Sequence, residues 1–244
     1  MVPATLGTLR SMAGKALLQS PSEIDARNRH LTGTLAELAA RHLVGRSGRA
    51  LDVGCQSGAQ MALMGAAGDF DWVGVDPKFD APQTSAAGDQ LLPSFAHQLP
   101  FPDATFELVL LANVYEHIQP AQRDASMREI HRVLKPGGVL VGQLPNPFFP
   151  VESHSRLPFM GYLPPSLRRR YWRLTPVHWE MDFYSITARD VRRRAERAGF
   201  QTLEVRGFNY PAEAIPAKVR PVARALSPVW KVVPWAWQFA FRKK

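Results

Sequence analysis

Ala50-Leu51-Asp52-Val53-Gly54-Cys55-Gln56-Ser57-Gly58-Ala59 is the stretch that decides the fold. Its apolar start predicts a short, buried, parallel strand over residues 50–53, followed by a tight turn over 54–58. Residues 59–66 are expected to continue as a helix. Glycine at positions 54 and 58 admits unusual backbone angles and leaves room for a ligand beside the main chain. The stretch therefore predicts a strand and a helix joined by a ligand-binding turn.

A second apolar run, Trp72-Val73-Gly74-Val75, ends on Asp76. In a doubly wound sheet, a carboxylate at the end of the neighbouring strand binds the two hydroxyls of a ribose. The glycines of the turn are spaced Gly-x-x-x-Gly, which differs from the dinucleotide pattern Gly-x-Gly-x-x-Gly. Asp52 before the turn would repel a pyrophosphate but attract an ammonium or sulfonium group. We therefore expect a nucleoside that carries an amino-acid tail.

Two further motifs lie downstream of these strands. Leu99-Pro100-Phe101-Pro102-Asp103-Ala104-Thr105-Phe106-Glu107 predicts a proline-stiffened turn that leads into a buried strand over 108–111. An amphipathic helix is expected over 120–134. Lys135-Pro136-Gly137-Gly138 is expected to end that helix and to direct a strand over 139–144. The order of elements favours an α/β fold with a parallel sheet.

Together, these motifs resemble the class I S-adenosylmethionine-dependent methyltransferases, in particular a small-molecule, ubiquinone-pathway-like subgroup. The resemblance rests on Leu-Asp-Val-Gly-Cys-x-Ser-Gly, Val-Gly-Val-Asp, Leu-Pro-Phe-x-Asp and Arg-Val-Leu-Lys-Pro-Gly-Gly, and covers about residues 45–145. It implies a doubly wound, Rossmann-like, seven-stranded sheet that is mostly parallel, with an antiparallel last strand. Helices on both faces and a loop-rich lid insertion complete the implied fold. S-adenosylmethionine is the implied cofactor.

The resemblance also implies which residues surround that cofactor. In related enzymes an acidic residue about four positions before Leu-Pro-Phe binds the adenine, whereas Phe95 stands there in this chain and Asp89 is the nearest upstream acid. Either the backbone around Phe95 borders the adenine, or the loop is displaced. The turn is expected to surround the methionine part, and the acid after the second strand to bind the ribose. The predicted cofactor-binding residues are Asp52, Gly54, Cys55, Gly58, Asp76, Pro77, Ala96, His97 and Asn113.

Composition and charge bound the class of protein. The chain has 244 residues, of which 45% are hydrophobic and 21% charged, as in a globular protein with a substantial core. One cysteine cannot form an internal disulfide, and neither a signal peptide nor a transmembrane run is recognised, so a cytoplasmic setting is expected. We divide the chain into an N-terminal arm and helix (1–44), a cofactor-binding core (45–145), a substrate lid (146–184) and a C-terminal helix with closing strands (185–244).

Positive charge is concentrated in the C-terminal part. Residues 1–144 carry a net charge of −2, and residues 145–244 carry +11. Two interpretations stay open, an anionic partner such as a phosphorylated substrate or the inner face of a membrane, and a solvated arginine-rich surface. If the anionic partner is a membrane, this half would make a peripheral contact with it. No nucleic-acid partner is predicted, because the sequence has no recognised RNA-binding module.

The remaining elements follow from periodicity and turn residues. A helix is expected over 23–44 with Ser22 as its cap, and another over 187–198. Strands are expected over 201–208 and 235–241, the last one antiparallel to its predecessor. The tryptophan-rich residues 229–237 are also compatible with a membrane interface, although the alternation of side chains favours a core strand.

Catalytic candidates lie at the end of the fourth strand and in the lid. His117 and His154 are the predicted catalytic residues, since a histidine commonly deprotonates an acceptor hydroxyl. His178 and Tyr184 are lesser candidates, and Arg168 to Arg170 could bind an anion.

Some ubiquinone-pathway O-methyltransferases resemble the stretch from Asn113 to His117, where they carry Glu-x-x-Glu-His with a divalent cation. In this chain Asn113 replaces the first acid. A divalent metal therefore stays open and is not predicted.

The expected activity is transfer of a methyl group from S-adenosylmethionine to a hydroxyl on a sugar, a glycolipid or a secondary metabolite. Aromatic residues and histidines in the lid motivate this acceptor class. Two alternatives stay open. One is a quinone or lipid C-methyltransferase, and the other is a catalytically degenerate member of the fold that acts as a binding protein.

Overall fold

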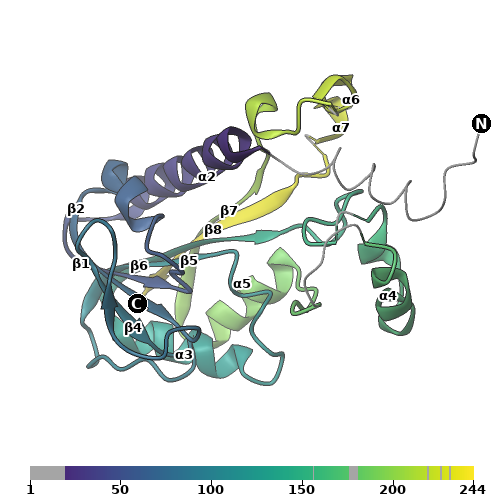
Figure 1. The fold of residues 1–244 in the computed structure, drawn as a ribbon. Coiled ribbons are helices and arrows are strands. Elements are labelled where there is room, and N and C mark those ends of the chain that lie inside the picture. Colours follow the sequence, from purple (N-terminus) through teal and green to yellow (C-terminus); the bar gives the residue numbers. More distant parts are fainter. Residues whose placement is uncertain (1–19, 156, 176–180, 219, 226, 231) are drawn as a thin grey trace, which may run out of the picture.

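The computed structural model describes residues 20–155, 157–175, 181–218, 220–225, 227–230 and 232–244 (Figure 1). Its centre is an eight-stranded sheet in the order β3-β4-β2-β1-β5-β6-β8-β7. β8 runs antiparallel to both of its neighbours, and the short β3 runs antiparallel to β4, while the other pairings are parallel. The strands are β1 Ser47–Val53, β2 Asp69–Asp76, β3 Gln83–Thr84, β4 Gln90–Pro93, β5 Phe106–Ala112, β6 Leu134–Pro145, β7 Phe200–Phe208 and β8 Ala236–Lys243.

The mostly parallel, Rossmann-like sheet with an antiparallel last strand is confirmed. Seven strands were expected, and the eighth is β3, which forms a two-residue antiparallel pairing with β4. The segment before β4 is rich in polar and small residues, so its sequence carries no alternation that would predict a strand.

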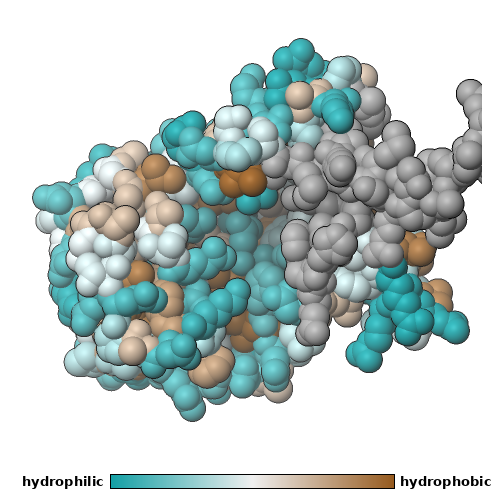
Figure 2. Space-filling view, in the orientation of Figure 1, coloured by the Kyte–Doolittle hydropathy of each residue, from teal (hydrophilic) through white to brown (hydrophobic). Residues whose placement is uncertain are grey.

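Helices cover both faces of the sheet. α2 (Pro21–His42) packs with one hydrophobic cluster, and α3 (Arg123–Val133) and α5 (Ala188–Arg197) pack with the other (Figure 1). α4 (Pro165–Trp172) projects from the lid at one end of the sheet, and Figure 2 shows its surface as mostly hydrophilic. The other helical pieces are η1 Met61–Leu63, η2 Gly65–Ala67, η3 Met160–Tyr162, η4 Ala212–Ala214, α6 Arg220–Ala225 and α7 Ser227–Trp230.

Capping residues set where two of these helices begin. Ser20 caps α2 in a capping box with Glu23, so the helix begins two residues before the predicted start at 23. Thr187 forms the same arrangement with Asp190 at the start of α5. α2 then buries Leu31, Leu35, Leu38 and Ala39 at helical spacing, as the sequence predicts.

Two predicted boundaries are wrong for identifiable reasons. The continuous helix over 59–66 is replaced by the short turns η1 and η2, because glycines at 58, 65 and 68 weaken helix formation there. Gly68 has a φ of 150° and leads directly into β2. The residues 135–138, expected to separate α3 from the next strand, instead form the beginning of β6. The pairing of β5 with β6 is irregular at that point.

The strand expected over 235–241 is present as β8 (Ala236–Lys243), whereas the start of the tryptophan-rich residues 229–237 belongs to α7. β8 begins at Ala236, and the ring of Trp235 lies 4.6 Å from that of Phe149 and 5.6 Å from that of Tyr210. Across the described ranges, no helix combines the length and apolar character needed to cross a membrane.

Candidate active site

The carboxyl ends of five parallel strands form one edge of the sheet. β1, β2, β4, β5 and β6 pair in parallel order, so the residues that follow them lie at this edge. Open α/β sheets bind ligands in the crevice at this edge. The predicted cofactor and catalytic residues lie in the last two positions of these strands or follow them, apart from His154, which the lid supplies.

The turn after β1 is tied to the neighbouring strand. Gly54 and Cys55 both donate their backbone N–H to the carbonyl of Val75, over 2.7 and 3.1 Å. Gly54 has a φ of 78°, and a Cβ at this position would lie 2.4 Å from a methyl group of Val114. Gly58 has a φ of 79°. The turn therefore requires glycine at both positions, because each has a positive φ and packs closely against neighbouring side chains.

Asp52 lies beside this turn as a buried acid that lacks a counter-charge. Its side chain belongs to a residue only 2% exposed, and Oδ2 has no hydrogen-bond partner within the described parts of the chain. Burial, together with repulsion from Asp76, raises the pKa of Asp52 from 3.8 to about 7. An ammonium group would supply the missing partner, so this site fits the amino-acid tail of the expected nucleoside.

Asp76 is held in a fixed orientation at the end of β2. Oδ2 accepts a hydrogen bond from the backbone of Gln56 at 3.0 Å, and Oδ1 accepts one from Lys78 at 2.9 Å. Each carboxylate oxygen can accept a further hydrogen bond, so a ribose diol can still be bound. Pro77 follows at the exposed side of the same turn.

Residues 94–98 form a turn next to Asp76. The backbone N–H of Ser94 approaches the Asp76 carbonyl at 3.4 Å, and the Ser94 hydroxyl donates to the carbonyl of Gln98 at 2.8 Å. Ala96 packs against the core, and the ring of His97 lies 5.4 Å from that of Phe95. Asp89 instead accepts a hydrogen bond from the Ser85 hydroxyl at 2.7 Å. The turn that carries Ala96 and His97 thus begins beside the backbone of Asp76.

Cys55 has a packing role in this part of the site. Its sulfur lies so close to Gly74 that a Cβ there would be 2.5 Å from Sγ. Burial raises the pKa of Cys55 to about 12, so the side chain stays a neutral thiol. Its contribution to cofactor binding is therefore expected to come from shape and backbone.

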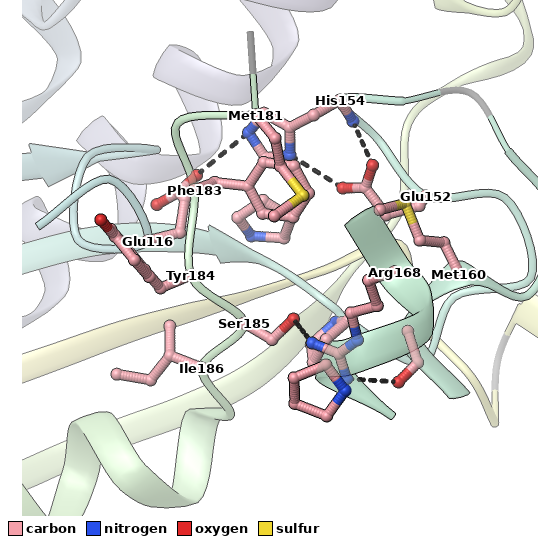
Figure 3. Close-up of a pocket in the computed structure, with 14 residues that line it drawn as sticks. Glu116, Glu152, His154, Met160, Arg168, Met181, Phe183, Tyr184, Ser185 and Ile186 are labelled. Atoms are coloured by element: carbon pink, nitrogen blue, oxygen red, sulfur yellow. Dashed lines mark hydrogen bonds and ion pairs between the residues drawn. The ribbon is translucent and has the colours of Figure 1, made fainter. Parts of the chain in front are cut away.

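A cavity of about 260 Å³ lies between the lid and the start of α5 (Figure 3). Glu116, Glu152 and His154 line one part, and Arg168 lies at another part of the wall (Figure 3). The guanidinium of Arg168 donates to Gly161, Leu163 and Ser185, so it braces the lid. The remaining wall is mostly apolar and comprises Pro145, Pro147, Met160, Pro165, Met181, Phe183, Tyr184 and Ile186.

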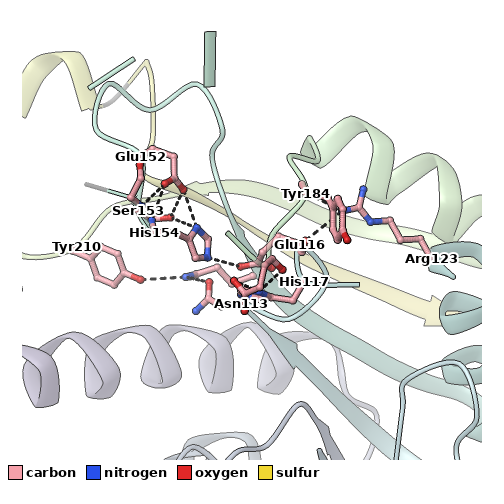
Figure 4. A network of polar contacts seen from close by, with 12 residues as sticks. Asn113, Glu116, His117, Arg123, Glu152, Ser153, His154, Tyr184 and Tyr210 are labelled. Atoms are coloured by element: carbon pink, nitrogen blue, oxygen red, sulfur yellow. Dashed lines mark hydrogen bonds and ion pairs between the residues drawn. The ribbon is translucent and has the colours of Figure 1, made fainter. Parts of the chain in front are cut away.

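Asn113 is fixed by the neighbouring strand. Its φ is 56°, and its backbone N–H donates to the Gln143 carbonyl at 2.9 Å. Its Oδ1 accepts from Nε2 of Gln143 at 3.2 Å, and the same nitrogen donates to the hydroxyl of Tyr210 at 3.3 Å (Figure 4). Non-glycine residues held at positive φ often belong to functional sites.

Three side chains from the loop after β5 and from the lid gather in one place, and we call them the Glu116–His117–His154 cluster. One potential ligand atom from each lies within 4.8 Å of the others. Nε2 of His154 is 4.0 Å from Oε1 of Glu116, and the two histidine rings are 5.2 Å apart in a T-shaped arrangement (Figure 4). The structure thus brings both predicted catalytic histidines together, although 37 positions of sequence separate them.

An acidic side chain lies beside Nδ1 of each histidine. Nδ1 of His154 is 2.8 Å from Oε1 of Glu152, and Nδ1 of His117 is 3.4 Å from Oδ1 of Asp182. Burial opposes ionisation of Glu152, but its hydrogen bonds with His154 and Ser155 lower its pKa to about 2. Burial also acts against a charged His154, yet the hydrogen bond with Glu152 gives a net increase in the pKa of this histidine. Burial raises the pKa of Glu116.

Several of these residues carry no signal in the sequence. Glu152 stands two positions before His154, which is the one local clue. Asp182, Gln143 and Tyr210 reach the site only through the fold. The role of Arg123 is not predicted from the sequence either. Its guanidinium donates to the carbonyls of Ile118 and Tyr184, and so fixes the end of the lid to the loop after β5. Of the lesser candidates, Tyr184 lines the cavity, whereas His178 lies outside the described residues.

The comparisons with known proteins agree with this geometry. Residues 51–142 match the family described as "Methyltransferase domain". A ubiquinone/menaquinone biosynthesis C-methyltransferase from Chromobacterium violaceum is 39% identical over 75 residues, which are 28% of this chain and 30% of that protein. The match therefore spans under a third of the relative's length.

Solved structures share the fold at low sequence identity. An S-adenosylmethionine-dependent methyltransferase from Mesorhizobium loti is 16% identical, with a TM-score of 0.58 over 86% of this chain and 98% of that one. One from Archaeoglobus fulgidus is 16% identical, with a TM-score of 0.56 over 88% and 94% of the two chains. Phosphoethanolamine N-methyltransferase 2 from Haemonchus contortus, solved with S-adenosyl-L-methionine, is 18% identical, with a TM-score of 0.54 over 86% of this chain and 52% of that one.

Proposed function

Because the chain belongs to the class I S-adenosylmethionine-dependent methyltransferases, we propose that it methylates a hydroxyl of a small molecule. The cofactor supplies an activated methyl group, so the protein has to align the acceptor and take up its proton. The observation that carries the proposal is the Glu116–His117–His154 cluster, in which two residues follow β5 and the third comes from the lid after β6. The acceptor class proposed is a sugar, a glycolipid or a secondary metabolite.

The cofactor would be held by residues at the ends of four strands, β1, β2, β4 and β5. The carboxylate of Asp52 would bind the ammonium group, and Asp76 would bind the ribose hydroxyls. The residues around them supply backbone and shape. These are Gly54, Cys55, Gly58, Pro77, Ala96, His97 and Asn113.

His117 and His154 are the residues that we propose to activate the acceptor hydroxyl. Each has Nδ1 beside an acidic group, and Nε2 of His154 lies 4.0 Å from Oε1 of Glu116. Such an arrangement fixes the orientation of an imidazole, and the hydrogen bond with Glu152 raises the pKa of His154. Either direct proton removal or a bound cation that lowers the pKa of the hydroxyl fits these positions.

The cavity narrows the acceptor class. Its wall consists largely of proline, methionine, phenylalanine and isoleucine side chains. Such a surface favours an alkyl or aryl portion over a bare sugar, because burial of apolar area supplies the binding energy. A glycolipid or an aromatic metabolite therefore fits the proposed site better than a free monosaccharide.

C-methylation of a quinone precursor is a second candidate. The partial similarity to the Chromobacterium violaceum C-methyltransferase favours it, and an apolar cavity also suits a quinol ring. A phenolic hydroxyl that loses its proton activates the adjacent ring carbon, so the same cluster would serve this chemistry.

A panel of acceptors incubated with methyl-labelled S-adenosylmethionine tests the proposal. Alkyl glycosides, flavonoid-type phenols and demethylated quinols would be compared, with and without Mg²⁺ and a chelator. We expect labelled methyl ether on a hydroxylated acceptor, and loss of at least about 100-fold in turnover for His154→Ala. His42→Ala is the matched control, since His42 pairs with Glu204 away from the cluster.

Two results would oppose the proposal. Label recovered on ring carbon would assign the C-methyltransferase activity instead. Absence of S-adenosylmethionine binding by calorimetry, with Asp76→Ala indistinguishable from the unmodified chain, would favour a degenerate member of the fold that acts as a binding protein.

A further inference from the structure

We infer that the Glu116–His117–His154 cluster binds a divalent transition-metal ion such as Zn²⁺, with Glu116 and His117 from the loop after β5 and His154 from the lid. The inference rests on the proposed function only for placing this ion beside the acceptor. Asn113 is not part of the site, because its side-chain oxygen accepts a hydrogen bond from Gln143.

Glu116 provides the first observation. The residue is 3% exposed, and neither of its carboxylate oxygens has a hydrogen-bond partner within the described segments of the chain. A buried carboxylate without hydrogen bonds is strongly unfavourable, and native structures pair such a group or use it to coordinate a metal. Both oxygens of Glu116 are thus available to a cation that enters the cluster.

The two histidines provide the second observation, which is independent of the first. The Nδ1 atoms of His154 and His117 are held by Glu152 at 2.8 Å and by Asp182 at 3.4 Å, and Nε2 of His154 lies 4.0 Å from Oε1 of Glu116. One ring nitrogen of His117 lies within 4.8 Å of the ligand atoms of the other two residues. Metal-binding histidines usually present one nitrogen to the ion and donate the other N–H to a carboxylate or a carbonyl. His117 also has the backbone carbonyl of Asp182 at 3.2 Å from the same nitrogen.

Local charge agrees with a dication. Three carboxyl groups surround the two imidazoles, namely those of Glu116, Glu152 and Asp182. The nearby guanidinium of Arg123 donates to the backbone carbonyls of Ile118, Glu116 and Tyr184. A bound divalent ion would therefore balance negative charge that the described side chains leave uncompensated.

The ligand set selects the type of ion. Two imidazoles and one carboxylate suit Zn²⁺ or Co²⁺, whereas Mg²⁺ prefers oxygen ligands in octahedral geometry. Ligand atoms around a four-coordinate ion lie roughly 3.3 Å apart, given bonds of about 2.0 Å. The present separation of up to 4.8 Å would contract by roughly 1–1.5 Å on binding, which requires only a small shift of the lid.

Packing around the cluster favours a small shift of the lid over a change in the orientation of the His154 ring. The ring of Phe183 stacks on His154 at a centroid distance of 4.3 Å and an interplanar angle of 14°. This ring covers the imidazole and keeps its plane fixed. Three protein ligands leave a fourth position open, where an acceptor hydroxyl could bind and lose its proton more readily.

The competing interpretation is an imidazolium. A proton on His154 could lie between Glu152 and Glu116, since the ring has one nitrogen near each. This alternative predicts no affinity for a metal ion, so a binding measurement separates the two.

Co²⁺ titration of the chelator-treated full chain is the test, because Co²⁺ replaces Zn²⁺ and its visible absorption reports the coordination geometry. We expect one ion per chain with the spectrum of a four- or five-coordinate site, and displacement by Zn²⁺ but not by millimolar Mg²⁺. His154→Ala and the nearly isosteric Glu116→Gln should each weaken Co²⁺ binding at least about 100-fold, and Glu152→Gln by about 10–100-fold. His42→Ala, which leaves the cluster intact, should bind as the unmodified chain does.

Thermal melting of each variant verifies that it folds. If His154→Ala does not fold, Glu116→Gln still provides the test. The inference is overturned if no Co²⁺ binds, if binding is equal in all variants, or if only Mg²⁺ binds. Failure of the methyl-transfer assay leaves these binding results unaffected. If the metal-free protein transferred methyl groups at the full rate, the proposed function would stand, and the ion would have no part in the reaction.

Discussion

Replacing Asp52 by asparagine should change the stability of the cofactor-free protein in a pH-dependent way. The folded state raises the pKa of this carboxyl from 3.8 to about 7, because the group is buried beside Asp76. The folded protein therefore holds the proton more tightly than the unfolded chain does. Stability is highest below about pH 4 as far as this group is concerned, and falls as the pH rises towards 7.

The magnitude follows from the two pKa values. Complete ionisation lowers the free energy of unfolding by about 4 kcal/mol, of which about 2.5 kcal/mol falls between pH 5 and pH 8. Asp52→Asn cannot ionise, so its melting temperature relative to the unmodified chain should rise by about 5–10 °C over that interval. Thermal melts at closely spaced pH values measure this difference, in which the effects of all other titrating groups cancel.

The proposed ammonium contact adds a second readout. A bound ammonium group favours the ionised carboxylate, so cofactor binding at pH 6 should release close to one proton, as calorimetry in buffers of different ionisation enthalpy measures. Asp52→Asn should abolish this release and weaken binding by about 10–100-fold. A melting-temperature difference that does not vary with pH would refute the raised pKa. Equal proton release by both proteins would refute the contact.

Further substitutions separate the turn from the lid. Gly54→Ala forces a side chain into a backbone with a φ of 78°, so we expect a loss of about 2 kcal/mol or more in chemical denaturation, together with lost cofactor binding. Arg123→Met removes the donor that joins the Tyr184 carbonyl of the lid to the Ile118 carbonyl of the loop after β5. Turnover should therefore fall about tenfold and proteolysis of the lid should accelerate, at unchanged cofactor affinity. Gly161→Ala would place a Cβ 1.5 Å from the Pro147 carbonyl and should likewise reduce turnover, whereas Gly65→Ala, with open space around it, should not.

The sequence predicts the sheet well because each buried strand is a nearly continuous apolar run between turn residues. β1 and β2 end on Val53 and Asp76, as expected, and the glycines of the intervening turn have the positive φ that their spacing suggests. The errors occur where short glycine-rich segments and tertiary pairing compete with local pattern. Residues 135–138 follow the end of α3, as their helix-ending signals predict, but they lie inside β6 as an irregular stretch between the pairs Phe106–Leu134 and Leu108–Val139.

The arrangement of the Glu116–His117–His154 cluster is less predictable from the sequence than the sheet is, for a different reason. Its two histidines are visible in the sequence, but the acids that orient them are not, because Asp182 and Glu152 come from separate parts of the lid. No short-range spacing relates Glu116 to His154. Only the return of the lid across the ends of β5 and β6, fixed by Arg123, brings them together.

The net charge of +11 in the C-terminal half does not by itself indicate an anionic acceptor, because several of its arginines form hydrogen bonds or ion pairs within the fold. Arg168 braces the lid through three hydrogen bonds, Arg194 pairs with Asp124, and Arg206 donates to Gln238. These guanidinium groups serve the fold. The cavity instead carries acidic groups on its polar side, where Glu116 and Glu152 lie. A phosphorylated acceptor would meet these acids at the point of reaction, so the charge distribution favours a neutral hydroxyl on an apolar framework.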